Sequence, residues 1–502
     1  MSFIPQKTDF EIVKQPIRKT YSKIELLNKS FKTTGQLEGE VISDSYSFDA
    51  DSDIRQTYQV TMLVKDASFT VGADKKIWID KYIRVSIGLY SDKLKKTVWY
   101  SQGIYILKSA GYSYNPTTKE LSLSCSDRMA ELTGSRNGQI SGFSTKITSN
   151  PKTKISDAMR DIITQIGGIP QYRITDLNED VPYDLEYGTG TNVYDVVREL
   201  RDLHVGYETF FDDEYFICQR YPTYETDPIV LNEDILAPLV ISENMDVNFE
   251  EIKNVSEVWG TAYETEHYTA AVTFTNDVYT ANYDGKIIAL SDGDVLGFMA
   301  SANNTAGAKF KADALNEIPI LCEGNKPIPA NKISSGSAYV LKYMVSGAEK
   351  YFYFCGLYQI CGVSKLVSRE PTQAEKDAQT LNEPTKNISW TVLADSPFCC
   401  DLPDVGEIRQ IYSGGEFDNI YSDELALQRA EYETWKSTDL RDTISLEMIE
   451  VPWLKVNQKI RYRSCTTDKV ETYLVKQKSG SSTGGIMTLS CVKFQPYYPW
   501  NI

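Results

Sequence analysis

Apolar and polar residues alternate in two short segments that lie far apart in the chain. The segment TYQVTMLV, residues 57–64, places apolar side chains at every second position, and TISLEMIE, residues 443–450, does the same. Because successive side chains along a strand point to opposite faces of the sheet, this alternation predicts two half-buried strands. Met62 and Met448 fall in the same phase and are predicted to point into a core.

Both strands belong to a longer repeat. The phrase DIRQTYQVTMLV begins at Asp53, and its counterpart DLRDTISLEMIE begins at Asp439. The same landmarks then follow in the same order: Trp78, Ile83-Arg84, Tyr105-Ile106-Leu107 and Leu123-Ser124-Cys125 in the first copy, and Trp453, Ile460-Arg461, Tyr473-Leu474-Val475 and Leu489-Ser490-Cys491 in the second. The offset falls from 439 − 53 = 386 to 491 − 125 = 366, as expected if the second copy has shorter loops. Chance likeness between β-rich segments is the alternative, but shared order and strand phase together favour a duplicated β-domain.

The period changes between the two copies. In TKISDAMRDIITQIGGIP, apolar residues recur with the spacing of an amphipathic helix, with Thr153 as the expected cap and Gly167-Gly168 as the end. A second helix is predicted in TNVYDVVRELRDLHVG, capped by Thr191 or Asn192. YETFFDDEYFICQRY then predicts a β-hairpin that turns at Asp212-Asp213.

The β pattern returns in MDVNFEEIKNVSEVWG, which begins at Met245. The following region, rich in Gly, Asn and aromatic residues, is expected to be an insertion containing one helix, NTAGAKFKADALNEI, and a buried strand, YFYFCGLYQICGV. An amphipathic segment, DELALQRAEYETW, leads into the second copy. The predicted fold is therefore mostly β with a smaller α+β part. The predicted domains are a first β-domain at residues 1–133, an α+β domain at 134–238, a split second β-domain at 239–275 plus 416–502, and an inserted peripheral domain at 276–415.

Composition narrows the possible functions. The chain has 502 residues, 41% of them hydrophobic, a net charge of −17 and a pI near 4.8. A nucleic-acid binder normally needs a basic patch, and the sequence has no run dense in Lys or Arg. The first residues, MSFIPQKTDFEIVKQ, do not resemble a secretory signal, and we expect no membrane association. Nine Cys without CxxC spacing favour a reducing, cytosolic folding compartment.

Little catalytic chemistry is visible. The two histidines, His204 and His267, are isolated, and neither an HExxH motif nor a phosphate-binding glycine loop occurs. The acidic pairs Asp212-Asp213 and Asp401-Asp404 could be imagined as glycosidase carboxylates, but turn residues are the simpler interpretation. We therefore expect no enzyme, and no catalytic, cofactor-binding or metal-binding residues. A Cys–His nucleophile, whose members meet only in space, stays open at this point.

Several motifs, in order, resemble one known family. They are LSLSCSDRMAEL from Leu121, ISDAMRDIITQIG from Ile155, VGYETFFDDEYFICQR from Val205, FEEIKNVSEVWG from Phe249, and QRAEYETW…VPWLKVNQKIRYR…ETYLVKQ from Gln428. The chain resembles the tail hub, or baseplate hub, proteins of tailed bacteriophages and contractile injection systems over most of its length outside 276–415. The order of the motifs is more specific than any one of them.

This resemblance implies two related tail-tube-like β-barrels in each subunit. Three subunits would then form a pseudo-sixfold ring that joins the tail tube to a threefold tip or spike and lines the DNA exit channel. The implied partners are a homotrimer, a tail tube or distal tail protein, a tip or spike protein, and other baseplate proteins through the 276–415 insertion. DNA would pass without sticking, since the chain is acidic.

The resemblance also implies a location and a limit. The protein would be made in the host cytoplasm and reside in the virion tail or baseplate. Because the sequence ends at Trp500-Asn501-Ile502, directly after the second β-domain, we expect no lytic or receptor-binding extension. Two alternatives stay open: a receptor- or carbohydrate-binding tail protein that uses the aromatic run at Tyr351, and a tail-associated cell-wall hydrolase with carboxylates in the insertion.

Overall fold

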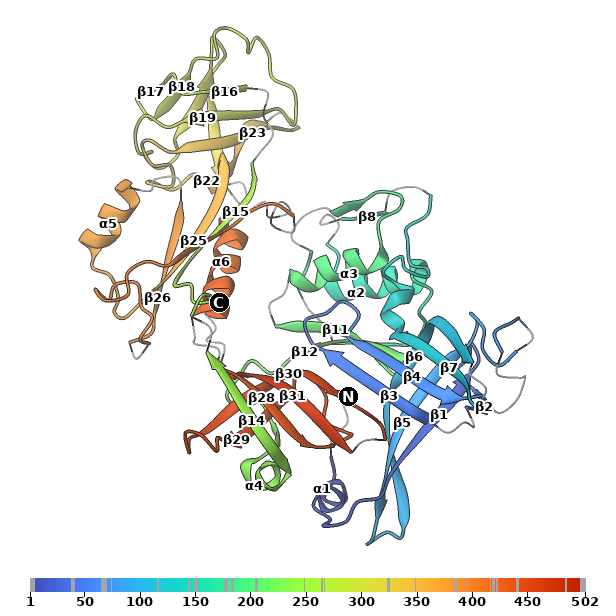
Figure 1. Ribbon diagram of the computed structural model, residues 1–502. Helices are drawn as coiled ribbons and strands as arrows, with labels where there is room; N and C mark the ends of the chain where they lie inside the picture. The colour runs from blue at the N-terminus through green and yellow to red at the C-terminus, as the bar shows by residue number, and fades with distance from the viewer. Residues whose placement is uncertain are drawn as a thin grey trace. The chain divides into compact units, whose positions relative to one another are not determined.

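The computed structural model describes most of the chain (Figure 1). The described residues are 5–37, 41–64, 70–73, 75–114, 117–142, 145–148, 152–175, 179–181, 185–203, 206–247, 249–262, 265, 267–322, 326–347, 349–382, 386–394, 396–415, 417, 420, 423–438, 442–483 and 485–496.

The chain divides into two compact units. The first contains residues 1–248 and 441–498, and the second contains residues 249–440. The elements of the first unit are α1 (Lys7–Val13), β1 (Thr20–Leu27), β2 (Thr33–Gln36), β3 (Val41–Asp49), β4 (Gln56–Leu63), β5 (Tyr82–Ser91), β6 (Lys96–Tyr114), β7 (Lys119–Asp127), β8 (Thr145–Ile147), α2 (Ile155–Asp161), β9 (Tyr172–Ile174), β10 (Leu185–Tyr187), α3 (Val193–Asp202), β11 (Tyr207–Asp212), β12 (Tyr215–Arg220), β13 (Ile229–Leu231), α4 (Glu233–Leu236), β14 (Val240–Val247), β28 (Asp442–Ile449), β29 (Lys459–Arg463), β30 (Val470–Gly480) and β31 (Ile486–Lys493).

The second unit is also mostly β. Its elements are β15 (Val255–Ala262), β16 (His267–Thr269), β17 (Val272–Thr275), β18 (Val278–Ala281), β19 (Val295–Met299), β20 (Lys309–Ala312), β21 (Ile318–Cys322), β22 (Lys326–Pro327), β23 (Ala338–Ser346), β24 (Glu349–Leu357), β25 (Gln359–Val367), α5 (Gln373–Asn382), β26 (Asn387–Val392), β27 (Arg409–Tyr412) and α6 (Asp423–Ser437).

The predicted duplication is present in the sheet of the first unit. Its strands form one barrel-like sheet in which β3-β4-β7-β6-β5 and β14-β28-β31-β30-β29 follow each other with the same neighbours. We call these five-stranded sets the first copy and the second copy. Tyr58 lies opposite Cys125 in the first copy, as Ile444 lies opposite Cys491 in the second. The predicted strands at 57–64 and 444–449 are thus confirmed as β4 and β28, in equivalent places.

Irregularities in the sheet are repeated as well. The pairing of β6 with β7 shifts at Lys108, and the pairing of β30 with β31 shifts at the equivalent Lys476. A second shift falls at Ile42 in β3 and at the equivalent Ile241 in β14. Because a bulge adds a residue and reorients the strand beyond it, shared bulges mean that both copies bend at the same points.

The tryptophans do not follow the repeat. Trp453 is buried in the core of the first unit, whereas Trp78 is 36% exposed and the preceding Ile77 is buried instead. Both residues lie in loops, where burial depends on the neighbours and not on strand phase. Asp439 and Arg441, in the second repeat phrase, lie outside the described residues.

The two helices predicted between the repeats, α2 and α3, follow the first copy and precede the second along the chain. They form a hydrophobic core of their own. Apolar residues of α2, of the π-helical turn after it and of α3 share one core with residues of the strands β11 and β12. Lys154, not the predicted Thr153, occupies the N-cap position of α2, because the helix begins at Ile155. Asn192, one of the two predicted candidates, precedes α3. The predicted hairpin is confirmed. Its turn is formed by Asp213 and Glu214, one residue later than predicted, because Asp212 still pairs with Tyr215, and Asp213 has a positive φ of 51°.

The second unit contains two sheets. β26-β25-β15-β27 carry α6 on one face, and Gly362 permits close approach because a Cβ there would lie 2.3 Å from the backbone of Ala426. The other sheet runs β16-β19-β23-β24-β21-β20-β18-β17. The segment 351–363, predicted as one buried strand, spans parts of β24 and β25.

Two expectations for this region differ from the structure. The helix predicted at residues 304–318 is absent, and β20 lies there, because Ala308, Phe310 and Ala312 are buried at every second position. The compact unit also extends beyond the expected insertion 276–415. β15 pairs with β25 and β27, and α6 packs on the same sheet, so both belong to the second unit by their contacts.

Burial of an aspartate tests the strand phase in both copies. Met62 is 1% exposed and Met448 is fully buried, so Met62→Asp or Met448→Asp places a carboxylate without a partner in the core. We expect each change to lower the free energy of unfolding by at least about 3 kcal/mol, measured by chemical denaturation. The matched control is Met299→Asp, at a strand position that is 37% exposed, for which we expect less than about 1 kcal/mol. Normal stability of both core variants would contradict the assigned phase.

Candidate functional site at the joint of the two copies

The two copies are joined edge to edge by backbone pairing. The end of β30, beyond its partner β29, continues alongside β3 in an antiparallel ladder that runs from Tyr46 opposite Gly480 to Asp49 opposite Gln477. A strand of the second copy therefore completes the edge of the first, and an exposed edge is converted into a continuous sheet. We call this ladder and the side chains around it the joint.

A buried ion pair lies at the joint. Lys478 of β30 is fully buried, and its Nζ lies 3.0 Å from Oε1 of Glu450, whose side chain is 2% exposed. Lys478 also donates to the carbonyls of Val451 and Leu454, each at 3.2 Å. Burial lowers the pKa of Lys478, and the neighbouring carboxylate of Glu450 opposes this.

Tyr46 of the first copy completes this polar cluster. Its hydroxyl donates to Glu450, and burial together with that carboxylate raises the Tyr46 pKa well above its usual value. Gly480 makes the approach possible, because a Cβ there would lie 2.6 Å from the hydroxyl oxygen. The charges from the second copy are thus satisfied with help from the first, so separating the copies would leave a buried polar group without its partner.

Asp44 adds a second polar contact. Its carboxylate accepts hydrogen bonds from Ser481, at 2.6 Å, from the backbone N–H of Ser482, at 3.1 Å, and from Tyr58, at 3.0 Å. The two serines follow β30, so this carboxylate holds the β30–β31 turn of the second copy against β3 and β4 of the first.

The equivalent residue of the second copy is Glu243, and its partners differ. Its carboxylate accepts from the hydroxyls of Tyr462 and Ser464 and from the backbone of Cys465 and Thr466, all within the same copy. Burial would raise the pKa of Glu243, but these hydrogen bonds hold it at about 2.

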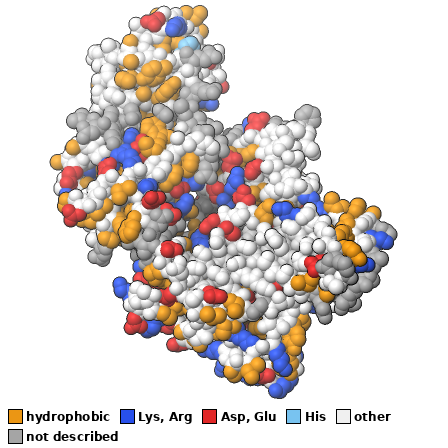
Figure 2. Space-filling view, viewed as in Figure 1, with side chains coloured by type: hydrophobic (Ala, Val, Ile, Leu, Met, Phe, Trp, Pro, Cys, Tyr) orange, Lys and Arg blue, Asp and Glu red, His pale blue; other side chains and the backbone are white. Residues whose placement is uncertain are grey.

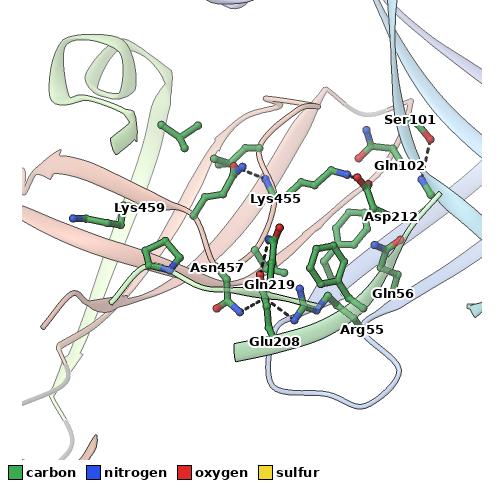
Figure 3. Close-up of a pocket in the computed structure, with 18 of the residues that line it drawn as sticks. Arg55, Gln56, Ser101, Gln102, Glu208, Asp212, Gln219, Lys455, Asn457 and Lys459 are labelled. Carbon is green, nitrogen blue, oxygen red and sulfur yellow. Dashed lines mark hydrogen bonds and ion pairs between the residues drawn. The ribbon is translucent and has the colours of Figure 1, made fainter. Parts of the chain in front are cut away.

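The hairpin β11–β12 is held between the two copies, beside a cleft (Figure 3). Glu208 of β11 accepts from Arg55, at 2.8 Å, and from Nδ2 of Asn457, at 2.6 Å. Arg55 precedes β4 of the first copy and Asn457 precedes β29 of the second, so one carboxylate connects the hairpin to both copies. The guanidinium of Arg55 also lies 4.4 Å from the ring centre of Phe210.

The tip of the hairpin makes a second set of contacts. Asp212 forms an ion pair with Lys455 of the second copy, and Asp213 accepts from Ser101 of the first at 2.5 Å. Gln102 spans the two copies directly, because its amide donates to the carbonyl of Pro452 at 2.9 Å. The acidic pair Asp212-Asp213 therefore holds the hairpin in place.

The cleft itself has a volume of about 220 Å³. Its walls come from both copies and from the hairpin, and Figure 3 shows Gln56, Gln219 and Lys459 around it with the residues above. Within the described part of the chain, Nε of Arg55 and Oδ1 of Asn457 are buried there without a hydrogen-bond partner. The other charged groups of the walls have partners: Arg220 pairs with Asp227, and Lys459 donates to the backbone carbonyls of Tyr224 and Glu225. This arrangement suits a structural joint better than a reacting centre.

The other residues singled out in the sequence do not assemble into a site. His204 lies outside the described residues, and His267 is in β16, with its ring 6.5 Å from that of Tyr283. Asp401 accepts from Ser368 in the second unit. Among the described residues, no group of three or more His, Cys, Asp or Glu could hold a metal ion. No described helix is both long and apolar enough to span a membrane.

Sequence reasoning missed Lys478 and Glu450, the buried ion pair of the joint, and Glu208, the buried carboxylate of the hairpin. One signal was available for Lys478. It occupies the position that Ala110 occupies in the first copy, on the apolar face of the strand. A lysine at such a position requires a buried partner, although the sequence does not say which residue supplies it.

Comparisons with known proteins give a domain match and distant structural matches. Residues 395–498 match a domain of unknown function, DUF5048. No curated protein matches the chain. The tail protein from Neisseria meningitidis MC58 is 9% identical, with 94% of this chain and 96% of that chain covered and a TM-score of 0.46.

Two further solved structures also match over most of the chain. The 43 kDa tail protein of prophage MuSo2 from Shewanella oneidensis is 10% identical, with 94% and 98% covered and a TM-score of 0.46. The prophage tail protein gp18 from Listeria monocytogenes EGD-e is 7% identical, with 93% and 94% covered and a TM-score of 0.39.

The buried ion pair predicts an asymmetric mutational response. Lys478→Met leaves the carboxylate of Glu450 buried without its cation, and we expect it to lower the unfolding free energy by about 3–5 kcal/mol. The double variant Lys478→Met with Glu450→Leu should recover most of that loss, apart from about 1–3 kcal/mol for the Tyr46 hydroxyl left without an acceptor. Denaturant unfolding of the two variants measures the difference. Equal losses in both would contradict the pairing.

The hairpin carboxylate predicts a loss of attachment between domains. Glu208→Ala leaves Arg55 and Asn457 without their shared acceptor, and we expect a loss of about 3 kcal/mol in unfolding free energy. Earlier proteolysis of the hairpin than of the two copies should accompany this loss. Glu186→Ala, at an exposed position of β10, is the matched control and should change stability by less than about 0.5 kcal/mol. If both variants behave alike, Glu208 does not hold the hairpin.

Proposed function

We propose that the chain is a structural virion protein of a tailed bacteriophage, namely a trimeric tail or baseplate hub. The observation that carries this proposal is the duplication: two five-stranded copies with the same register and the same bulges, joined edge to edge in one sheet. A chain that already contains one such joint is suited to repeat it, and one heterologous contact repeated between copies can close a ring.

Three subunits supply six copies, and this number lets the ring connect structures of sixfold and threefold symmetry. Six similar barrels match a sixfold tail tube on one side, while the threefold symmetry of the subunits matches a tip or spike on the other. The net charge of −17 supports a channel that DNA passes without adhering. The protein is made in the host cytoplasm and resides in the virion tail.

The second unit is the proposed docking element. It has its own core, and the chain enters it after β14 and leaves it before β28, so this unit is proposed to bind other baseplate proteins. The tail tube or distal tail protein and the tip or spike protein bind the two faces of the ring. The chain itself is non-enzymatic.

The carbohydrate-binding alternative loses its main support. The aromatic run at Tyr351 was its candidate platform, but Tyr351 is only 8% exposed and Phe352 is fully buried in the core of the second unit. A sugar platform needs aromatic faces open to solvent. The hydrolase alternative gains no support either, since Asp401 accepts from Ser368 and thereby closes a loop.

The mass of the assembled protein tests the proposal. Each chain has a mass of 56.7 kDa, so a trimer has 3 × 56.7 = 170.1 kDa. We expect light scattering across a concentration series to show monomers converting to that mass without stable intermediates, and electron microscopy to show rings with six lobes. A cell-wall clearing assay is the control for the hydrolase alternative. A stable dimer or tetramer, or clearing activity that a single carboxylate variant abolishes, would contradict the hub.

A further inference from the structure

Each copy has one edge that the chain itself does not complete. In the first copy, β6 extends past its last pairing with β5, at Ile106, and residues 109–111 have β7 on one side only among the described strands. In the second copy, β14 pairs with β28 and with no other described strand. Long unprotected edges of this kind favour pairing with another chain.

The duplication shows what these two edges are equivalent to. Matching the pairings with β7 and β31 makes Ser109, Ala110 and Gly111 equivalent to Gln477, Lys478 and Ser479. Matching the pairings with β4 and β28 makes residues 245–247 equivalent to residues 46–48. The open edges are thus the counterparts of the two strands that form the joint.

We infer that residues 110–111 of one chain pair antiparallel with residues 246–247 of a second copy of this chain, in the register of the joint. Ala110 then lies opposite Val247, and Gly111 lies opposite Asp246, as Lys478 lies opposite Phe48 and Ser479 lies opposite Ser47. The inference rests on the proposed trimeric function and names the contact that closes the ring.

The side chains at these edges support the pairing. The buried polar cluster of the joint consists of Tyr46, Glu450 and Lys478, and the three equivalent positions hold Met245, Val64 and Ala110. Every member of the polar cluster is replaced by an apolar residue, so no unpaired charge would be buried at the second contact.

Burial at the equivalent positions differs in the expected direction. Tyr46, Glu450 and Lys478 are 0–1% exposed in the joint. Their counterparts Met245, Val64 and Ala110 pack against the core but remain partly exposed. An apolar residue that is half-buried at an incomplete edge becomes fully buried when a strand is added, which contributes to association.

The exchange of polar for apolar residues also fixes the order of subunits. If β30 of one chain paired with β14 of another, Lys478 would lie beside Met245 of that chain and not beside Tyr46, and the cluster with Glu450 would be left incomplete. The first copy must therefore meet the second copy of the next chain. This head-to-tail rule produces a closed ring with alternating copies.

The inferred contact between chains shares with the joint only the backbone ladder, with apolar side chains in place of the polar cluster. Asp44 binds the turn after β30 at the joint, but the equivalent Glu243 is already engaged by Ser464, Cys465 and Thr466 of its own copy. The contact between chains therefore lacks this hydrogen-bonded turn, and we expect it to separate before the joint does.

Disulfide trapping tests the register. Gly111→Cys with Asp246→Cys is made in a Cys465→Ser background, because Cys465 is exposed and could compete. Directly opposite strand positions lie within disulfide reach. On oxidation we expect covalent trimers from the double variant, covalent dimers from a mixture of the two single variants, and no product from either single variant alone.

Two controls separate the possible failures. Ser47→Cys with Ser479→Cys should form a disulfide within one chain, since these residues pair at the joint. Ser113→Cys with Asp246→Cys lies two residues out of register and should react poorly. If the protein has the mass of a trimer and the 47–479 disulfide forms but the 111–246 disulfide does not, this inference is overturned and the proposed function is left intact. A monomer at every concentration would overturn the proposed trimer itself, and cross-linking of a single variant would show a symmetric contact instead.

A lysine at the open edge gives an independent test. Ala110→Lys recreates the charge of Lys478 without its carboxylate, and we expect it to weaken association at least about a hundredfold. Adding Val64→Glu supplies the missing partner and should restore part of the affinity. Ser109→Lys, at the exposed neighbouring position, is the matched control and should leave the trimer intact. Trimers of the Ala110→Lys variant with unchanged affinity would overturn the inference, and thermal unfolding of the monomers confirms that each variant folds.

Discussion

The antiparallel ladder between β3 and β30 is the contact on which the rest of the first unit depends. It joins strands that are more than four hundred residues apart in sequence into one sheet, and it places Lys478 and Glu450 where water cannot reach them. A buried ion pair of this kind adds little net stability over an apolar contact. The ion pair does favour pairing of β30 with the strand that carries Tyr46, because any other strand would leave a buried polar group without its partner. A chain with two similar strand edges requires this kind of specificity.

The helix-and-hairpin domain reinforces this joint from the side. Glu208 accepts from Arg55 and Asn457, which belong to different copies, so the two copies and the hairpin share one carboxylate. Removing either partner would leave a charge in a buried place, and the three parts are therefore expected to unfold together. The second unit has a separate core.

Much of the fold could be predicted because the signals are local. Alternation in β4 and β28 follows from the geometry of a strand, and the stripe in α2 follows from that of a helix. The helix predicted across Ala308, Phe310 and Ala312 was wrong because a short alternating run was masked by helix-favouring neighbours. The insertion boundary was misplaced for a different reason: β15 and α6 have ordinary local patterns, and only their partners assign them to the second unit.

The sequence by itself determined the repeat, the phase of its strands and the position of the two helices α2 and α3, since each depends on residues close together in the chain. Only the tertiary structure decided which edges meet. Neither the pairing of Lys478 with Glu450 nor the shared acceptor Glu208 can be seen without the tertiary contacts, because partners brought together across a sheet carry no marker in the sequence. The candidate site is made of such long-range contacts, and it was therefore the part that sequence reasoning did not find.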